Sequence, residues 1–216
     1  CLTSPGVGST SLPRRTRPGS STWTQPATVV AESQRVTPPR QILPGKTVII
    51  TSRAVGQTFR FVPKKRVVAS IWYCLAVLTA RKEYGVRIHE VIYMSNHLHI
   101  VATFDDDSMP DFMQALNSLV SRQLNALRGR TGSNFEPHFN AVEIADASKI
   151  LDHCAYTLAN PCAAHLVTRA VGWRGVTSVR LEYGQTITIE RPKCGMWKPK
   201  RLEEKKRQRA KQSGKP

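Results

Sequence analysis

Two strand-like segments joined by a two-residue turn occupy residues 86–104, and they constrain the fold more than any other feature of this chain. The segments are VRIHEVIYMS and HLHIVATF, with Ser95 and Asn96 at the turn. A connection this short brings its flanking strands together as an antiparallel hairpin. The chain is therefore expected to contain an antiparallel sheet.

Segments with helical and strand periods flank this hairpin. In chain order the expected elements are a strand at 46–54, a helix at 64–85, the hairpin, a helix at 109–130, a strand at 139–144 and a helix at 147–160. Residues 57–61 (QTFRF) either continue the first strand past a bulge at Gly56 or form a hairpin arm. Pro63 opens the first helix, Gly85 stops it, and Pro161 ends the last. This order predicts an α+β fold: a ferredoxin-like split β-α-β sheet with helices on one face.

Length and composition predict one folded core with tails. The chain has 216 residues, 40% of them apolar, which suffices for one core. Residues 1–40, rich in Ser, Thr, Pro and Gly, are expected to be disordered; residues 41–180 form the domain and 181–216 a basic C-terminal extension. The sequence has no apolar run of about 18–20 residues and no N-terminal export signal, so we expect a cytoplasmic protein that spans no membrane. Five scattered cysteines without a C-x-x-C pair indicate reduced thiols.

The net charge of +17 is concentrated at the ends of the chain. Residues 191–216 hold 11 basic against 2 acidic residues, a net of +9, whereas residues 41–190 hold 16 against 12, a net of +4. Basic arms on a modestly charged domain favour a polyanionic partner, and nucleic acid before membrane because no amphipathic apolar face accompanies the charge. The alternative is a tail that only improves solubility.

Two histidines stand one residue apart in the second strand of the hairpin. Because side chains alternate along a strand, His97, His99, Val101 and Thr103 share one face. A single histidine in such a run is most often a core residue satisfied by one hydrogen bond. Two on one face favour another interpretation, since paired imidazoles at this spacing can chelate one metal ion.

A tyrosine and an asparagine lie one turn apart on the last expected helix. Tyr156 and Asn160 are four residues apart and so share a side. Taken alone, the tyrosine is typical of packing and the asparagine of a helix terminus. Taken with the histidines, two imidazoles and one amide oxygen leave open positions on Mg²⁺ or Mn²⁺, and a phenol one turn away could attack a phosphodiester.

The motifs MSNHLH, on a strand, and YTLANPCAAHLV, about sixty residues later, resemble those of the HUH single-tyrosine transposases. The similarity is greatest to the REP-associated tyrosine transposases of bacteria and covers roughly residues 41–179. The commonest form of the first motif has proline where Ser95 stands, and serine can serve the same turn. The second motif, Y-x-x-x-N-P, is intact.

This resemblance implies a site and a chemistry. His97 and His99 would be the metal ligands, Asn160 the third ligand and Tyr156 the nucleophile, with Mg²⁺ or Mn²⁺ as the ion. The family cleaves and rejoins single-stranded DNA at imperfect hairpins through a 5′-phosphotyrosine intermediate, which implies a monomer or homodimer acting near the bacterial nucleoid. Phosphate contacts are expected from basic residues of the domain and the tail: Arg53, Lys64, Lys65, Arg66, Arg128, Arg130, Lys200 and Arg201.

Three other functions stay open at this point. The protein could bind hairpin DNA as a domesticated or truncated transposase without cleaving it. It could be an RNA-recognition module of similar topology, although such modules display aromatic residues on the sheet. It could also be a hydrolytic nuclease, which would cut without forming a covalent adduct.

Overall fold

A four-stranded antiparallel sheet forms the centre of the fold in the computed structural model, which describes residues 44–192. The strands are β1 (Thr47–Arg53), β2 (Val86–Tyr93), β3 (His97–Phe104) and β4 (Asn140–Glu143), in the spatial order β2-β3-β1-β4. The predicted hairpin is confirmed as the β2–β3 pair. The predicted disorder of residues 1–40 and most of the basic extension, with Lys200 and Arg201, lie outside the described residues.

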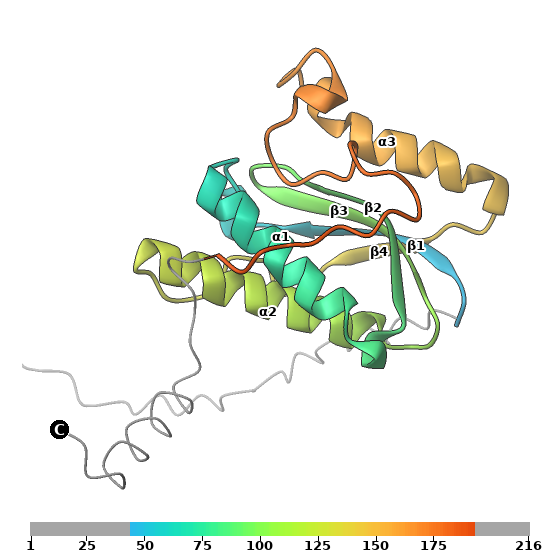
Figure 1. The fold of residues 1–216 in the computed structure, drawn as a ribbon, viewed down its shortest axis with the longest axis horizontal. Coiled ribbons are helices and arrows are strands. Elements are labelled where there is room, and N and C mark those ends of the chain that lie inside the picture. Colours follow the sequence, from blue (N-terminus) through green and yellow to red (C-terminus); the bar gives the residue numbers. More distant parts are fainter. Residues whose placement is uncertain (1–43, 193–216) are drawn as a thin grey trace, which may run out of the picture. The chain divides into compact units, whose positions relative to one another are not determined.

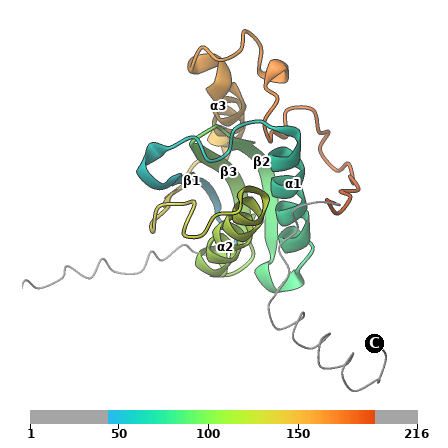
Figure 2. The same cartoon turned by 90° about the vertical axis from the view of Figure 1, so that its left-hand side faces the viewer.

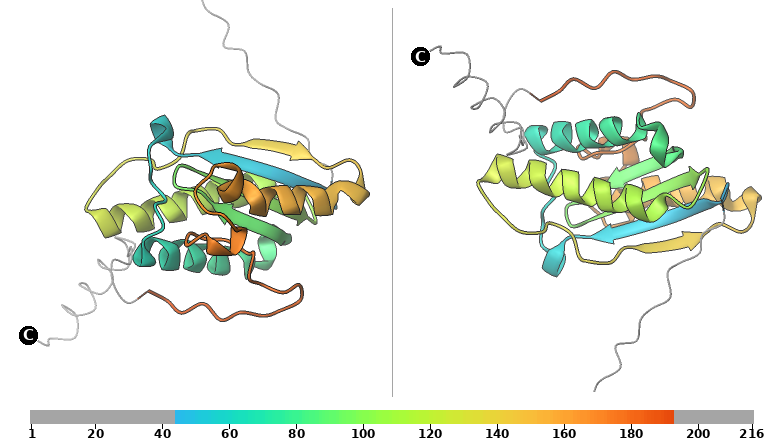
Figure 3. Two further views of the ribbon diagram at one scale, coloured as in Figure 1. Left: turned by 90° about the horizontal axis from the view of Figure 1, so that it is seen from above. Right: turned by 90° about the horizontal axis from the view of Figure 1, so that it is seen from below.

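Three helices pack on this sheet, on opposite faces. Helices α1 (Lys65–Thr79) and α2 (Met109–Arg128) lie side by side below it in Figure 1, and α3 (Ile150–Ala163) crosses the other face. The end-on view of Figure 2 and the two views of Figure 3 agree on this arrangement. The ferredoxin-like α+β fold is confirmed. Helices α1 and α2 lie on one face of the sheet as expected, but α3 lies on the opposite face.

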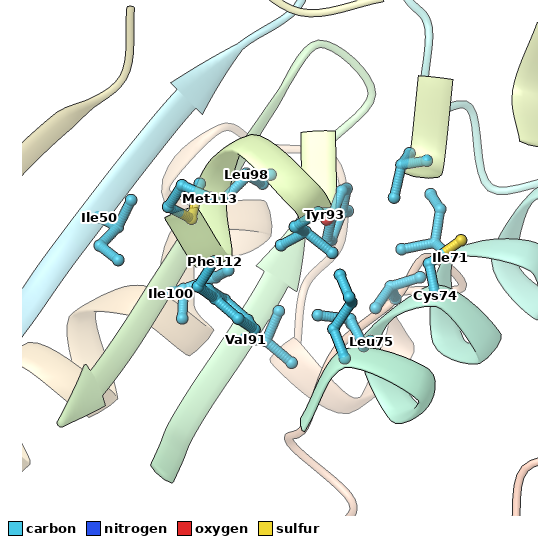
Figure 4. Close-up of a cluster of buried hydrophobic side chains, with 14 of the residues drawn as sticks. Ile50, Ile71, Cys74, Leu75, Val91, Tyr93, Leu98, Ile100, Phe112 and Met113 are labelled. Atoms are coloured by element: carbon cyan, nitrogen blue, oxygen red, sulfur yellow. The ribbon is translucent and has the colours of Figure 1, made fainter. Parts of the chain in front are cut away.

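The main core lies between the sheet and the helix pair α1/α2. Figure 4 shows Ile50, Leu98 and Ile100 of the sheet beside Phe112 and Met113 of α2, with Ile71, Cys74 and Leu75 of α1 on the side of Val91 and Tyr93. Each such side chain contributes roughly 1.5–3 kcal/mol by leaving water. The alternation of β3 sends Leu98, Ile100 and Ala102 into this core and leaves the intervening residues for the α3 face.

A second, smaller core lies under α3. Val101 of β3 packs there with Ile144 and with Cys154 of α3. Beyond α3 the chain returns to the sheet, where residues 176–178 cover the free edge of β2: Tyr93 N–H donates to the Val176 carbonyl oxygen at 2.9 Å, and Ser178 N–H to that of Val91 at 3.0 Å. None of the described helices is long and apolar enough to cross a membrane.

Three predicted boundaries were wrong. Residues 57–61 form no strand: Gly56 and Gln57 both adopt positive φ, +59° and +52°, which turns the chain out of the sheet after a short 3₁₀ turn. The first helix ends at Thr79, and Gly85 closes a separate 3₁₀ turn. Pro161 does not end α3, which runs on to Ala163.

Candidate functional site

The two histidines of β3 lie side by side on the face that α3 covers. His97 pairs with Arg53 of β1 and His99 with Thr51, and both side chains share the face of Val101, which packs on α3. The ring centroids are 5.0 Å apart with the planes nearly perpendicular, at 87°. Both residues are half-buried, so each ring retains a solvent-accessible part. The sequence prediction that the rings share one face is therefore confirmed.

Each imidazole has its Nδ1 atom occupied by a neighbour. His97 Nδ1 lies 2.8 Å from Asn96 Oδ1, and His99 Nδ1 lies 2.9 Å from Thr51 Oγ1. An amide oxygen only accepts, so His97 Nδ1 carries the proton and Nε2 keeps its lone pair. For His99 the hydroxyl could donate or accept, and in either case Nε2 is the nitrogen left for another partner. Metal-ligating histidines characteristically have such a fixed second nitrogen.

Burial keeps both rings neutral. It lowers the pKa of His97, with the Arg53 guanidinium adding to the effect. It also lowers the pKa of His99 to about 4, helped by His97 and then by Arg53. At neutral pH both rings are therefore neutral, and the Nε2 lone pair is free on His97 and, when Nδ1–H of His99 donates to Thr51, on His99 as well. This donor set fits a divalent cation, which binds neutral imidazole.

Any third ligand from the described residues would be of a type other than His, Cys, Asp or Glu. Within residues 44–192, no group of three or more His, Cys, Asp and Glu side chains is arranged to hold a metal ion. An amide oxygen is a ligand for hard cations such as Mg²⁺. Asn160 is the residue of this kind that the sequence predicts.

Helix α3 carries Tyr156 and Asn160 on one side, one turn apart. Its buried face consists of Cys154, Thr157 and Pro161, and it packs on β2 and β3. The Tyr156 side chain is 61% exposed, unusually so for a tyrosine that packs, whereas Asn160 is half-buried. The exposed phenol makes Tyr156 accessible to a large substrate.

The Asn160 side chain has a structural contact that the sequence did not predict. Its Nδ2 donates to the carbonyl oxygens of Tyr156 and Thr157, each at 3.1 Å. The Thr157 oxygen is the acceptor that the backbone N–H of residue 161 would serve, and proline has none. The amide supplies the missing donor, which explains how α3 continues past Pro161. The contact uses only the Nδ2 atom of the amide.

The basic residues predicted to contact DNA that the structure describes lie in two places: beside His97, and at the start of α1 and the end of α2. Arg53, at the end of β1, is exposed and lies beside His97. Lys64, Lys65 and Arg66 are exposed at the start of α1, and Arg128 and Arg130 lie at the end of α2.

The start of α1 and the end of α2 meet in space. Lys64, Arg128 and Arg130 line one cavity together with Phe59 and Arg60. The sequence analysis missed Phe59 and Arg60 because it assigned their segment to a strand. It also missed Asn96 and Thr51 as partners of the histidines. Asn96 could have been found from its position next to His97, whereas Thr51 depends on strand register.

Comparison with solved structures supports the same fold. A REP-associated tyrosine transposase bound to a REP hairpin aligns with 65% of this chain and 80% of its own length, at 14% identity and a TM-score of 0.53. A proposed transposase from Deinococcus radiodurans R1 aligns with 54% of this chain and 92% of its own length, at 13% identity. Its TM-score of 0.37 is too low to indicate a shared fold. No family model and no curated protein matches the sequence. At such identity the likeness establishes a shared fold.

Proposed function

We propose that this protein is a transposase that cleaves and rejoins single-stranded DNA at hairpins through a 5′-phosphotyrosine intermediate. The observation that carries the proposal is the pairing of two neutral imidazoles on β3 with an exposed tyrosine on the helix packed over that face. The fold shared with a REP-associated tyrosine transposase supports it. Each element also has an ordinary structural explanation, but none explains the combination.

Tyr156 is the proposed nucleophile. Its phenolic oxygen attacks the scissile phosphorus, a Tyr–O–P bond forms, and the P–O3′ bond breaks to release a 3′-hydroxyl. The tyrosine loses its proton and the leaving oxygen gains one. Attack of another 3′-hydroxyl on the phosphotyrosine reverses the step, so strands are rejoined without ATP because one phosphoester replaces another.

His97, His99 and Asn160 are the proposed metal ligands, through the two Nε2 atoms and Oδ1. A divalent ion held there, Mg²⁺ or Mn²⁺, would orient the phosphate and offset charge that develops on its oxygens. The protein's own contribution is to fix the ligand atoms in advance. Asn96 and Thr51 hold the two rings at Nδ1, and the α3 backbone holds the Asn160 amide.

The Tyr156→Phe variant provides the main test. The substrate is an oligonucleotide with a hairpin and a single-stranded flank, labelled at its 3′ end so that the covalently held fragment carries the label. The wild type should give a protein–DNA adduct on a denaturing gel, and the Phe variant none, with binding unchanged because one oxygen is lost and little volume. Cleavage by Tyr156→Phe at the wild-type rate would contradict the assignment. Cleavage by the wild type without an adduct would indicate a hydrolytic nuclease, and binding without cleavage a domesticated protein.

The His97→Gln and His99→Gln variants test the metal ligands. Each should lower metal-dependent cleavage by at least ~10²-fold while the domain stays folded. The matched control is His89→Gln on β2, whose ring lies 2.7 Å from Thr103 Oγ1, away from the pair. An equal loss of cleavage in the control would contradict the metal-ligand assignment. A loss of stability in the His97 and His99 variants with metal-stimulated cleavage retained would show that these residues serve packing.

A further inference from the structure

A cavity of about 340 Å³ lies where the β1–α1 connection meets the end of α2. Its lining residues are Thr58, Phe59, Arg60, Val62, Lys64, Arg128 and Arg130. The views of Figure 3 show this connection passing the C-terminal end of α2. The volume is at the lower end of the range of small-ligand cavities, which suits one nucleotide-sized group rather than a duplex.

The cavity is strongly cationic. Four of its lining residues are Arg60, Lys64, Arg128 and Arg130, and no acidic residue is among them. The Arg128 guanidinium donates to the Arg60 carbonyl oxygen, which fixes one cation at the wall. Arg60 Nε is buried and has no hydrogen-bond partner among the described residues. Four like charges and a buried unpaired donor are stabilised by an anion placed between them.

An exposed aromatic ring completes the cavity. The Phe59 side chain is 70% exposed although its neighbour Phe61 is fully buried and stacks on Phe135. One exposed apolar residue alone needs no explanation. An exposed ring beside a cationic groove is the arrangement by which proteins bind single-stranded nucleic acid, with a base stacked on the ring and the backbone on the cations.

The cavity is attached to the end of the sheet where the histidines begin. Phe61 N–H donates to the Ser95 carbonyl oxygen at 2.8 Å, and Ala54 N–H to that of Asn96 at 2.7 Å. These bonds fasten the segment that carries Phe59 and Arg60 to the turn directly before His97. The cavity therefore lies at the same end of the sheet as His97, on the segment that leaves β1 there.

We propose that this cavity binds one unpaired nucleotide of the single-stranded DNA that flanks the hairpin, with its base stacked on Phe59 and its phosphate held by Arg60, Lys64, Arg128 and Arg130. The inference deepens the proposed function and rests on it for the identity of the DNA. It assigns the cavity a positional role, because a ring and four cations in one cavity act on the base and the phosphate of a single nucleotide.

The stacking contact is tested by Phe59→Leu, with Phe59→Tyr as the matched control that keeps the ring. Fluorescence anisotropy with the full-length protein measures affinity for the flanked hairpin. Stacking of one base is worth about 1–3 kcal/mol, so Phe59→Leu should weaken binding by about 5- to 150-fold and Phe59→Tyr should not. An abasic site is then moved along the flank. At one position the wild type should lose the same affinity, and Phe59→Leu should lose nothing more.

The cations are tested by the salt dependence of the same binding. Lys64→Gln and Arg130→Gln should each reduce the slope of log K against log salt by roughly 0.7, the value for one phosphate contact on a single strand. Lys82→Gln is the control, since this exposed lysine lies outside the cavity lining and should leave the slope unchanged. Unchanged affinity and slope in the cavity variants, or equal abasic effects at every flank position, would overturn the proposal.

The covalent adduct at Tyr156, measured on the same samples, separates this inference from the proposed function. Adduct formation by the wild type together with unaffected binding in the cavity variants would refute the cavity and leave the function standing. Loss of binding in the cavity variants with no adduct from the wild type would support the cavity and refute the proposed cleavage.

Discussion

The hydrogen bond from Asn160 to the Thr157 carbonyl makes a quantitative prediction that separates the structural role of this asparagine from its proposed ligand role. Pro161 leaves that carbonyl without its regular helical donor, and Thr157 is fully buried. Asn160→Ala removes the substitute donor at 3.1 Å. A buried acceptor left unpaired costs about 1–3 kcal/mol, and about 2 kcal/mol lowers the melting temperature of a domain this size by about 4–8 °C.

A second substitution restores the donor in another way. Pro161→Ala gives residue 161 a backbone N–H that can donate to the Thr157 carbonyl. Against this background Asn160→Ala should cost only about 0.5 kcal/mol, so the two changes should couple by about 1–2 kcal/mol. The effect of Pro161→Ala itself on packing and on the unfolded chain cancels in the cycle.

Urea denaturation followed by circular dichroism of the four proteins measures the coupling, in buffer with a chelator so that no metal contributes. Tyr156→Phe is the control, since it changes the same helix at an exposed position and should leave stability unchanged. An equal cost for Asn160→Ala in both backgrounds would refute the reasoning. Cleavage should stay low in both Asn160→Ala proteins, because Pro161→Ala restores the helix bond but no ligand oxygen.

Three further predictions concern other parts of the chain. The folded pKa of His99, about 4, is below the ordinary value near 6.5, so the unfolded chain takes up a proton first as pH falls. The free energy of unfolding of the metal-free protein should therefore be full above pH ~6.5 and decrease by about 1–2 kcal/mol toward pH 4. Urea titrations at several pH values measure this decrease, which should be smaller in His99→Gln. Burial raises the pKa of the Cys74 thiol to about 12, so iodoacetamide at pH 8 should alkylate half-buried Cys162 in the folded protein and Cys74 only after unfolding, as read by peptide mass spectrometry. Deletion of residues 191–216 should weaken binding to hairpin and random single strands alike and flatten the salt slope by roughly 0.7 per lost contact, whereas an unchanged slope in anisotropy would show that the tail makes no phosphate contact.

Local periodicity was sufficient for the order and type of the main elements. The alternation in residues 97–104 placed His97 and His99 on one face, and the four-residue spacing placed Tyr156 and Asn160 on one side of a helix. These are properties of a single strand or helix, which depend only on backbone geometry over a few residues. They could therefore be predicted before any packing was known.

Only the tertiary structure decided what these side chains meet. The face that α3 covers, the Thr51 partner of His99 and the cavity around Phe59 join segments far apart in the chain. Their positions depend on strand register and on which apolar faces bury one another, both set by the packing of the whole domain. The neutrality of the two imidazoles follows from the same packing, because burial rather than residue type lowers their pKa values.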